Sequence, residues 1–140
     1  MTKSLKTLVR ICEWNVDQKR TELRVKLDAL AVQEQKLTSL MDELAREQEY
    51  SASSPNEGGF YYANYGLEVI RKQENITKEI VEMKQMAEVV REELGNAYYE
   101  LKKFEIVAKN RIEQENSEIE RKEQILLDEV GISNFIRKNN

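Results

Sequence analysis

Histidine is absent from this 140-residue sequence, which contains one cysteine and one proline. Without histidine and with a lone cysteine, the chain can build neither a Ser–His catalytic pair nor a zinc site. One cysteine also excludes an internal disulfide, which fits a reducing cytosol. We therefore expect no enzymatic activity, no metal ion and no cofactor.

Long apolar runs and basic blocks are missing as well. No stretch approaches the length of a signal-peptide core or of a membrane-spanning helix. The 22 basic and 26 acidic residues give a net charge of −4 and are spread along the chain, which makes nucleic acid a poor candidate partner. The expectation is one cytoplasmic domain without membrane insertion.

What remains is a highly charged chain (34% charged, 7% aromatic) with strong periodicity, which is typical of long helices and coiled coils. In residues 4–48 one apolar row repeats every seventh residue and predicts a helix. A companion row three residues later is weaker and reads Cys12, Lys19, Lys26, Gln33 and Leu40. We expect Leu27 and Met41, one place later, to replace part of it.

A break follows at residues 51–59, "SASSPNEGG", because proline and paired glycines disfavour a helix interior. Heptads return with both rows filled and predict a second helix over 61–130. Gly131 is predicted to end it, with a loose tail over 131–140. The predicted seam comprises Val9, Val16, Leu23, Leu30, Leu37 and Leu44 with Val69, Ile76, Ile80, Met83, Val90, Leu94, Leu101 and Phe104.

These segments predict an all-α fold over residues 1–140, an antiparallel coiled-coil hairpin whose C-terminal helix is longer and overhangs. A fold-back near residue 55 would let the first helix cover the second only to about residue 105. Some 25 residues, roughly 37 Å of helix, would then remain unpaired. Because an isolated polar helix of that length is marginal in water, another protein is expected to stabilise it.

Apolar side chains off the predicted seam gather at both ends of this hairpin. At the base, where the termini meet, Ile11 and Trp14 lie off the seam of the first helix. The second helix adds Tyr98, Tyr99 and Ile106 at the same level. They indicate either an interface or a cap on the end of the bundle. At the tip, Tyr50 and the aromatics of 60–65 either close the turn or bind a partner.

The order and lengths of these parts resemble the FliJ family of flagellar type III export proteins. The resemblance covers most of the chain. It is best at the opening "SLKTLVRI", at "FYYANY" after the turn, and at "EELGNAYYELKKFE…RIEQENSEIERKEQILLDEV".

The resemblance implies a non-catalytic stalk that inserts into a hexameric export ATPase, promotes its assembly and activity, and contacts the membrane export gate and export chaperones. It would act in the cytoplasm, at the inner face of the membrane, in flagellum biogenesis and motility. The implied ATPase contacts are Leu5, Leu8, Ile11, Trp14, Tyr98, Tyr99, Ile106, Ile112, Ile119 and Leu126. The implied gate contacts are Tyr50, Phe60, Tyr61, Tyr62 and Tyr65.

Two other interpretations remain open at this stage. The chain could be a structural coiled coil whose overhang pairs with its own copy, although we expect the isolated chain to be a monomer. It could also be the equivalent stalk of a virulence injectisome, which the helical pattern does not distinguish from a flagellar one.

Overall fold

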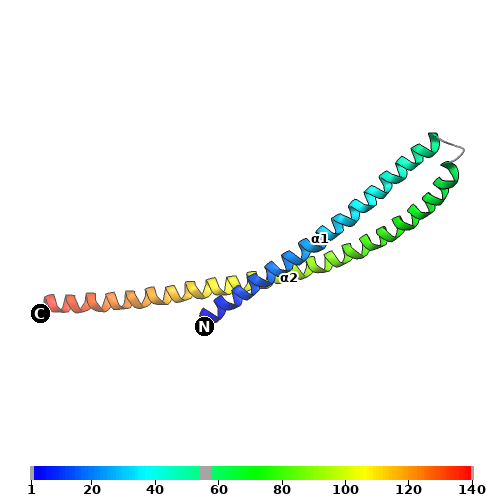
Figure 1. Cartoon of the computed structure of the whole chain (residues 1–140). Coiled ribbons are helices and arrows are strands. Elements are labelled where there is room, and N and C mark those ends of the chain that lie inside the picture. Colours follow the sequence, from blue (N-terminus) through cyan, green and yellow to red (C-terminus); the bar gives the residue numbers. More distant parts are fainter. Residues whose placement is uncertain (1, 54–57, 140) are drawn as a thin grey trace. The chain divides into compact units, whose positions relative to one another are not determined.

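The computed structural model describes the backbone of residues 2–53 and 58–139, and their side chains except at positions 2, 51, 53 and 58–63. This part of the chain forms two α-helices, α1 over Thr2–Ser53 and α2 over Gly58–Asn139 (Figure 1). It contains no strand. The all-α fold is thus confirmed, with two antiparallel helices of which the C-terminal one is longer.

Both helices extend further into the turn region than the sequence predicted. Helix α1 reaches Ser53 instead of ending at residue 48, and α2 already begins at Gly58. The Gly58–Gly59 pair therefore lies in the first turn of α2. The N–H groups of a first turn lack helical partners in any case, so glycine disrupts less there than in a helix interior. Residues 54–57 of the predicted break lie outside the described residues.

The predicted loose tail over 131–140 is wrong for the residues that the structure describes, because α2 continues through Gly131 to Asn139. A glycine commonly ends a helix by taking a left-handed conformation, yet no described glycine has a positive φ. Ile132, Phe135 and Ile136 follow at helical spacing. The helix therefore continues across Gly131, at a propensity cost of about 1 kcal/mol relative to alanine.

Contacts divide the chain into two compact units, where the sequence predicted a single domain. The terminal unit consists of Met1–Val16 and Asn96–Asn140, and the central unit of Asp17–Gly95. Each unit contains one segment of α1 and one of α2, so each is described by itself below.

Within each unit, burial follows the heptad rows. Every predicted seam residue is buried or half-buried. The buried apolar residues are Cys12, Val16, Val69, Ile80, Ala87, Val90 and Leu101. Each helix of a two-helix hairpin has a single neighbour along most of its length, so only one stripe on it can be covered.

The weak companion row of α1 stays on the seam, contrary to the expectation that neighbouring apolar residues replace it. Lys19, Lys26 and Gln33 are half-buried. Leu27 and Met41 instead remain 37% and 42% exposed. A shift of one place turns a side chain by about 100° around the helix, which moves it off the stripe. The lysines fit because their methylene stems cover apolar surface while the ammonium groups reach water.

Polar contacts between the helices mark the register of the central unit. Lys19 Nζ donates hydrogen bonds to the carboxylates of Glu93 on α2 and Glu22 on α1. These bonds, first the one to Glu93, raise the pKa of Lys19. Further along the helices, the Tyr65 hydroxyl donates to Glu43 Oε2 at 3.4 Å. Because these groups are partly exposed, the pairs align the helices more than they stabilise them.

The polar seam positions predict a stabilising substitution. Replacing Lys26 and Gln33 together by leucine should raise the free energy of unfolding by roughly 1–2 kcal/mol, because two half-buried polar side chains become apolar. Urea denaturation followed by circular dichroism measures the change. Arg24→Leu, at an exposed position of the same helix, is the control and should shift stability by less than about 0.5 kcal/mol. Equal effects of the two changes would contradict the seam assignment.

Candidate partner-binding site

The terminal unit contains the N-terminal turns of α1 packed on a stretch of α2. Cys12, Val16 and Leu101 are buried there. Half-buried positions on α2 continue as far as Arg111. Coverage of α2 thus extends almost one heptad beyond the predicted limit near residue 105, since α1 already begins at Thr2. The overhang, defined here as residues 113–139 of α2, is correspondingly displaced towards the C-terminus.

All the residues that the resemblance assigned to an ATPase contact lie in the terminal unit. Leu5 and Leu8 are half-buried, so they also contribute to the packing of α1. The others are exposed by between 42% (Ile112) and 68% (Tyr99). These exposed members are Ile11, Trp14, Tyr98, Tyr99, Ile106, Ile112, Ile119 and Leu126. The helices therefore leave most of the predicted contact residues accessible.

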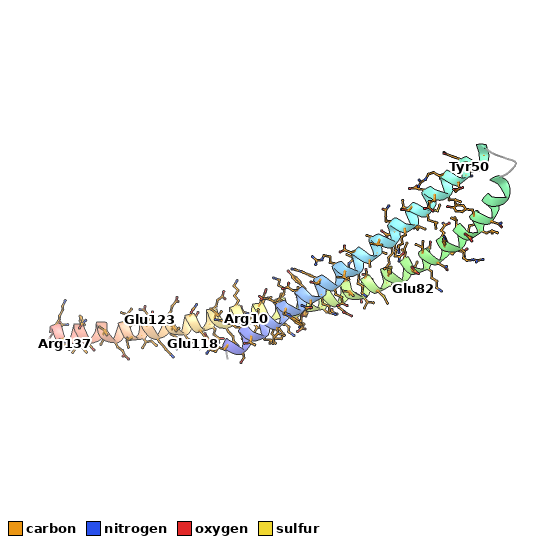
Figure 2. All side chains as sticks on the ribbon, viewed as in Figure 1. Arg10, Tyr50, Glu82, Glu118, Glu123 and Arg137 are labelled. Carbon is orange, nitrogen blue, oxygen red and sulfur yellow. The ribbon has the colours of Figure 1, made fainter. Side chains whose placement is uncertain are left out.

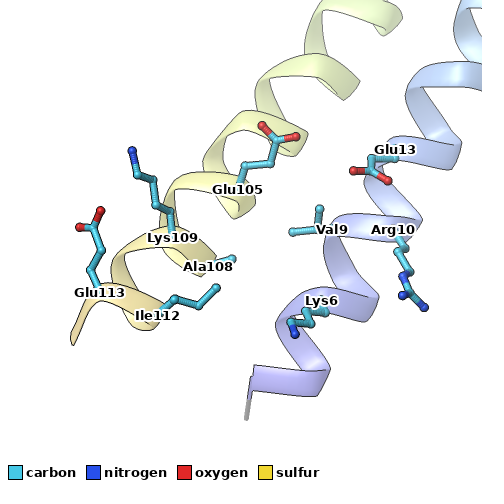
Figure 3. Close-up of a pocket in the computed structure, with 9 residues that line it drawn as sticks. All are labelled: Lys6, Val9, Arg10, Glu13, Glu105, Ala108, Lys109, Ile112 and Glu113. Atoms are coloured by element: carbon cyan, nitrogen blue, oxygen red, sulfur yellow. The ribbon is translucent and has the colours of Figure 1, made fainter. Parts of the chain in front are cut away.

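A groove of about 580 Å³ lies between α1 and α2 in the terminal unit (Figure 3). Its apolar side chains are Val9 from α1 and Ala108 and Ile112 from α2, which face one another across the groove. Its charged rim consists of Lys6, Arg10 and Glu13 on α1 and Glu105, Lys109 and Glu113 on α2. An apolar floor with a rim of both signs suits an amphipathic side chain or helix from a partner.

Every described side chain of the overhang is exposed. In Figure 2 the side chains of this segment, with Glu118, Glu123 and Arg137 labelled, project from the ribbon on several sides. At 1.5 Å per residue the overhang is roughly 40 Å long. The structure thus leaves its apolar side chains open to solvent.

The apolar side chains of the overhang form two stripes on different faces, roughly 120° apart around the helix. One continues the seam face of α2 through Ile112, Ile119, Leu126 and Val130, by steps of seven, seven and four residues. The other, over the last turns, contains Ile125, Ile132 and Ile136. Leu127 and Phe135 lie between the stripes and are also exposed. A helix that is apolar on more than one face is normally buried on more than one face.

Reasoning from sequence missed Ile125, Leu127, Val130, Ile132, Phe135 and Ile136. Ile132, Phe135 and Ile136 were overlooked because Gly131 was interpreted as a helix end, which assigned the residues after it to a loose tail. Ile125, Leu127 and Val130 precede the glycine but lie off the seven-residue row through Ile119 and Leu126. The usable signal was the spacing of Ile125, Ile132 and Ile136, which continues helical periodicity across the glycine.

A charged side chain of α2 contacts one of the exposed aromatics of the terminal unit. Lys102 Nζ lies 5.2 Å from the centre of the Tyr98 ring and donates a hydrogen bond of 3.1 Å to Glu105. That hydrogen bond is the largest cause of the raised pKa of Lys102. Lys102 remains protonated at neutral pH, so it orients the ring by a cation–π contact while leaving it open to a partner.

The predicted gate contacts belong to the central unit and are only partly described. Tyr50 is 65% exposed. Tyr65 is half-buried, and burial together with the nearby Glu43 carboxylate raises the pKa of its hydroxyl. The side chains of Phe60, Tyr61 and Tyr62 lie outside the described residues. The tip thus presents one accessible and one partly packed aromatic among those that can be placed.

The described residues provide no other chemistry. Among them, no cluster of three or more acidic or cysteine side chains is placed to hold a metal ion, and Cys12 is buried. Within residues 2–53 and 58–139, neither helix has a long enough apolar stretch to cross a membrane. What the arrangement can do is present apolar and aromatic side chains to another protein.

Comparison with known proteins gives one match. The model of a family described as "Flagellar FliJ protein" matches residues 1–140. No curated protein sequence and no solved structure matches the chain.

Because the overhang is exposed, we expect the protection of backbone amides from hydrogen exchange to change sharply along α2. Amide protons of residues 115–137 should exchange with solvent much faster than those of 97–111, because an unpaired helix of this length opens readily in water. Hydrogen exchange read by mass spectrometry of the full chain measures this. The seam stretch 76–94 provides an internal reference. Equal protection of 115–137 and 97–111 would mean that another helix, such as a second copy, covers the overhang.

Proposed function

The chain belongs to the FliJ family, and we propose that it is the stalk of the flagellar export ATPase, bound to the ring of that enzyme through the terminal unit. Because it belongs to this family, the chain is a component of the flagellar export apparatus. The role of the family is non-catalytic. The stalk role, the ring and the site are the proposal.

The observation that carries the proposal is the overhang. Its described side chains are all exposed, yet it is apolar on more than one face. Pairing with one helix would cover only one of these faces. A ring of subunits around the helix would cover both, which is why a pore is favoured over a single flat partner.

The groove and the off-seam aromatics also belong to the terminal unit, so they support binding through that unit. Trp14 and Tyr99 are 62% and 68% exposed, although tryptophan and tyrosine each offer a large apolar area. Such side chains are enriched among residues that dominate binding energy. We assign Trp14, Tyr99, Ile11 and Ile106 to the walls of the ring entrance, and Ile119 and Leu126 to its interior.

Full burial of an isoleucine or leucine side chain is worth roughly 1.5–3 kcal/mol. Several such side chains on the overhang therefore offer more than enough to offset the cost of immobilising one helix. Bound in this way, the overhang would also become a stable helix, because packing supplies what its sequence lacks alone.

The proposal also includes the membrane export gate and the export chaperones. The aromatic tip around Tyr50 and Tyr65 is our candidate for the membrane export gate, together with Phe60, Tyr61 and Tyr62 beyond the described side chains. Export chaperones would be escorted by the same stalk. The protein would then work in the cytoplasm, against the inner face of the membrane.

Aspartate substitutions in the overhang test the proposal. Replacing both Ile119 and Leu126 by aspartate should weaken binding to a hexameric flagellar export ATPase at least 10-fold and abolish any increase in its ATP hydrolysis rate. The reason is that two carboxylates would have to be buried in the ring. The measurements are a binding titration and the steady-state hydrolysis rate, with purified ring and full-length chain.

The matched control is Ser117→Asp with Gln124→Asp, which introduces the same charge into the same helix off the seam-face stripe. It should retain most of the binding. If both double variants bind as tightly as the unsubstituted chain, the overhang does not enter the ring and the proposal fails.

A further inference from the structure

Exposed apolar side chains also gather on one flank of the central unit, far along the chain from the overhang. Val25 and Val32 on α1 are 59% and 56% exposed, and Met86 and Val89 on α2 are 57% and 54% exposed. Together with the small Ala29, they define what we call the lateral patch. Isolated exposed valines are ordinary on a protein surface, so the patch is informative only if its members lie together.

The contact between Tyr65 and Glu43 shows that they do. Residues separated by multiples of seven occupy one row along a heptad helix. Met86 is three heptads beyond Tyr65, and Ala29 is two heptads before Glu43. The rows that contain Ala29 and Met86 therefore face each other across the seam, on the same flank as Tyr65 and Glu43.

The remaining members extend these rows onto the outer surface of the same flank. Val25 and Val32 lie four residues before and three residues after Ala29, which places them on the same face of α1. Val89 follows Met86 by three residues on α2. The Lys19–Glu93 pair aligns the two stretches, since six residues after Lys19 and four before Glu93 bring Val25 within two residues, about 3 Å, of the level of Val89. The patch thus spans both helices at one height.

The opposite flank of the central unit is a distinct surface. It is marked by the pair between Lys84 and Glu34, whose charged atoms are 4.0 Å apart. Val81, three residues before Lys84 on the same face of α2, lies on that flank and is 50% exposed. It therefore offers a comparison of the same residue type on the same helix.

The charges around the lateral patch are mainly negative. Its acidic neighbours on the two helices are Glu22, Asp28, Glu79, Glu82 (labelled in Figure 2) and Glu93. Lys19 already binds Glu22 and Glu93, and the other basic residues near this flank are Lys26, Lys36 and Lys78. An apolar patch with an acidic rim suits an apolar surface bordered by lysine or arginine.

We propose that the lateral patch binds a basic amphipathic helix of another protein. The i, i+4, i+7 stripe of α1 and the i, i+3 pair of α2 form two walls that a third helix of about three turns can contact at once. Its apolar face covers the two walls while its basic flanks meet the acidic rim. The interface is small, so its affinity is micromolar and sensitive to salt.

A synthetic peptide serves as the probe. It has about 18 residues, enough for five turns, with leucine at helical i, i+4, i+7 spacing and lysine on either side. A scrambled peptide of identical composition, and a version with glutamate in place of lysine, are the comparisons. Binding to the full-length chain is measured by fluorescence anisotropy at two salt concentrations. The amphipathic basic peptide alone should bind in the micromolar range.

Two variants locate the site. Val25→Asp with Val89→Asp should weaken peptide binding at least 10-fold, whereas Val81→Asp should leave it unchanged. Asp28→Asn with Glu82→Gln, which leaves the apolar patch intact, should weaken binding several-fold and flatten its salt dependence. Circular dichroism must show unaltered helicity and melting for each variant that is scored.

Three results would overturn the inference. They are equal binding of the scrambled peptide, equal loss on Val81→Asp, or full binding by the Val25→Asp, Val89→Asp variant. The same double variant should bind the export ATPase normally, because both substitutions lie in the central unit. A failure of the lateral patch is thereby separated from a failure of the proposed stalk function.

Discussion

The single seam between two helices of unequal length is the constraint on which the rest of this structure depends. A helix with one neighbour can bury one stripe, and in this chain the stripe is fully buried at only a few positions, such as Val16, Val69 and Val90. Helix α1 has 52 residues and α2 has 82. In the part of the chain that the structure describes, the side chains at the end of α2 are therefore exposed, as are many apolar side chains off the seam. Each such side chain is available to another protein.

The seam itself is less apolar than it could be. Lys19, Lys26 and Gln33 occupy positions where leucine would pack better, and polar residues at such positions lower stability while specifying register. Here the Lys19–Glu93 pair aligns the two helices of the central unit. That alignment brings Val25 and Val89 to a similar level, so polar residues that lower stability on the seam also help to position the lateral patch.

Sequence reasoning recovered the fold because heptad spacing follows directly from helix geometry. The rows through Val9 and Val69 identified the seam. It failed where a single residue was given too much weight. Gly131 was read as a stop, although α2 continues past it because Ile132 and Ile136 keep the helical spacing. Leu27 was preferred to Lys26 on apolar character alone, whereas the heptad phase decides which of the two faces the seam.

The candidate site was predictable in part. Trp14 and Tyr99 lie off any heptad stripe, so their exposure follows from the pattern. The apolar end of the overhang did not follow, since it depended on the error at Gly131. The groove beside Val9 could not be predicted, because it depends on which part of α2 lies beside the start of α1. No helical pattern names a partner. The flagellar context was predicted from the resemblance to the FliJ family, which the family match confirms.

Sedimentation velocity of the full-length chain, alone and mixed with a hexameric flagellar export ATPase, tests the central claim most directly. The account predicts a monomer when alone and a chain that sediments with the ring when mixed, in a ratio of one chain per hexamer. A stable homodimer that ignores the ring would contradict it. The overhang would then serve self-pairing, and the apolar stripes of α2 would be the interface between two copies.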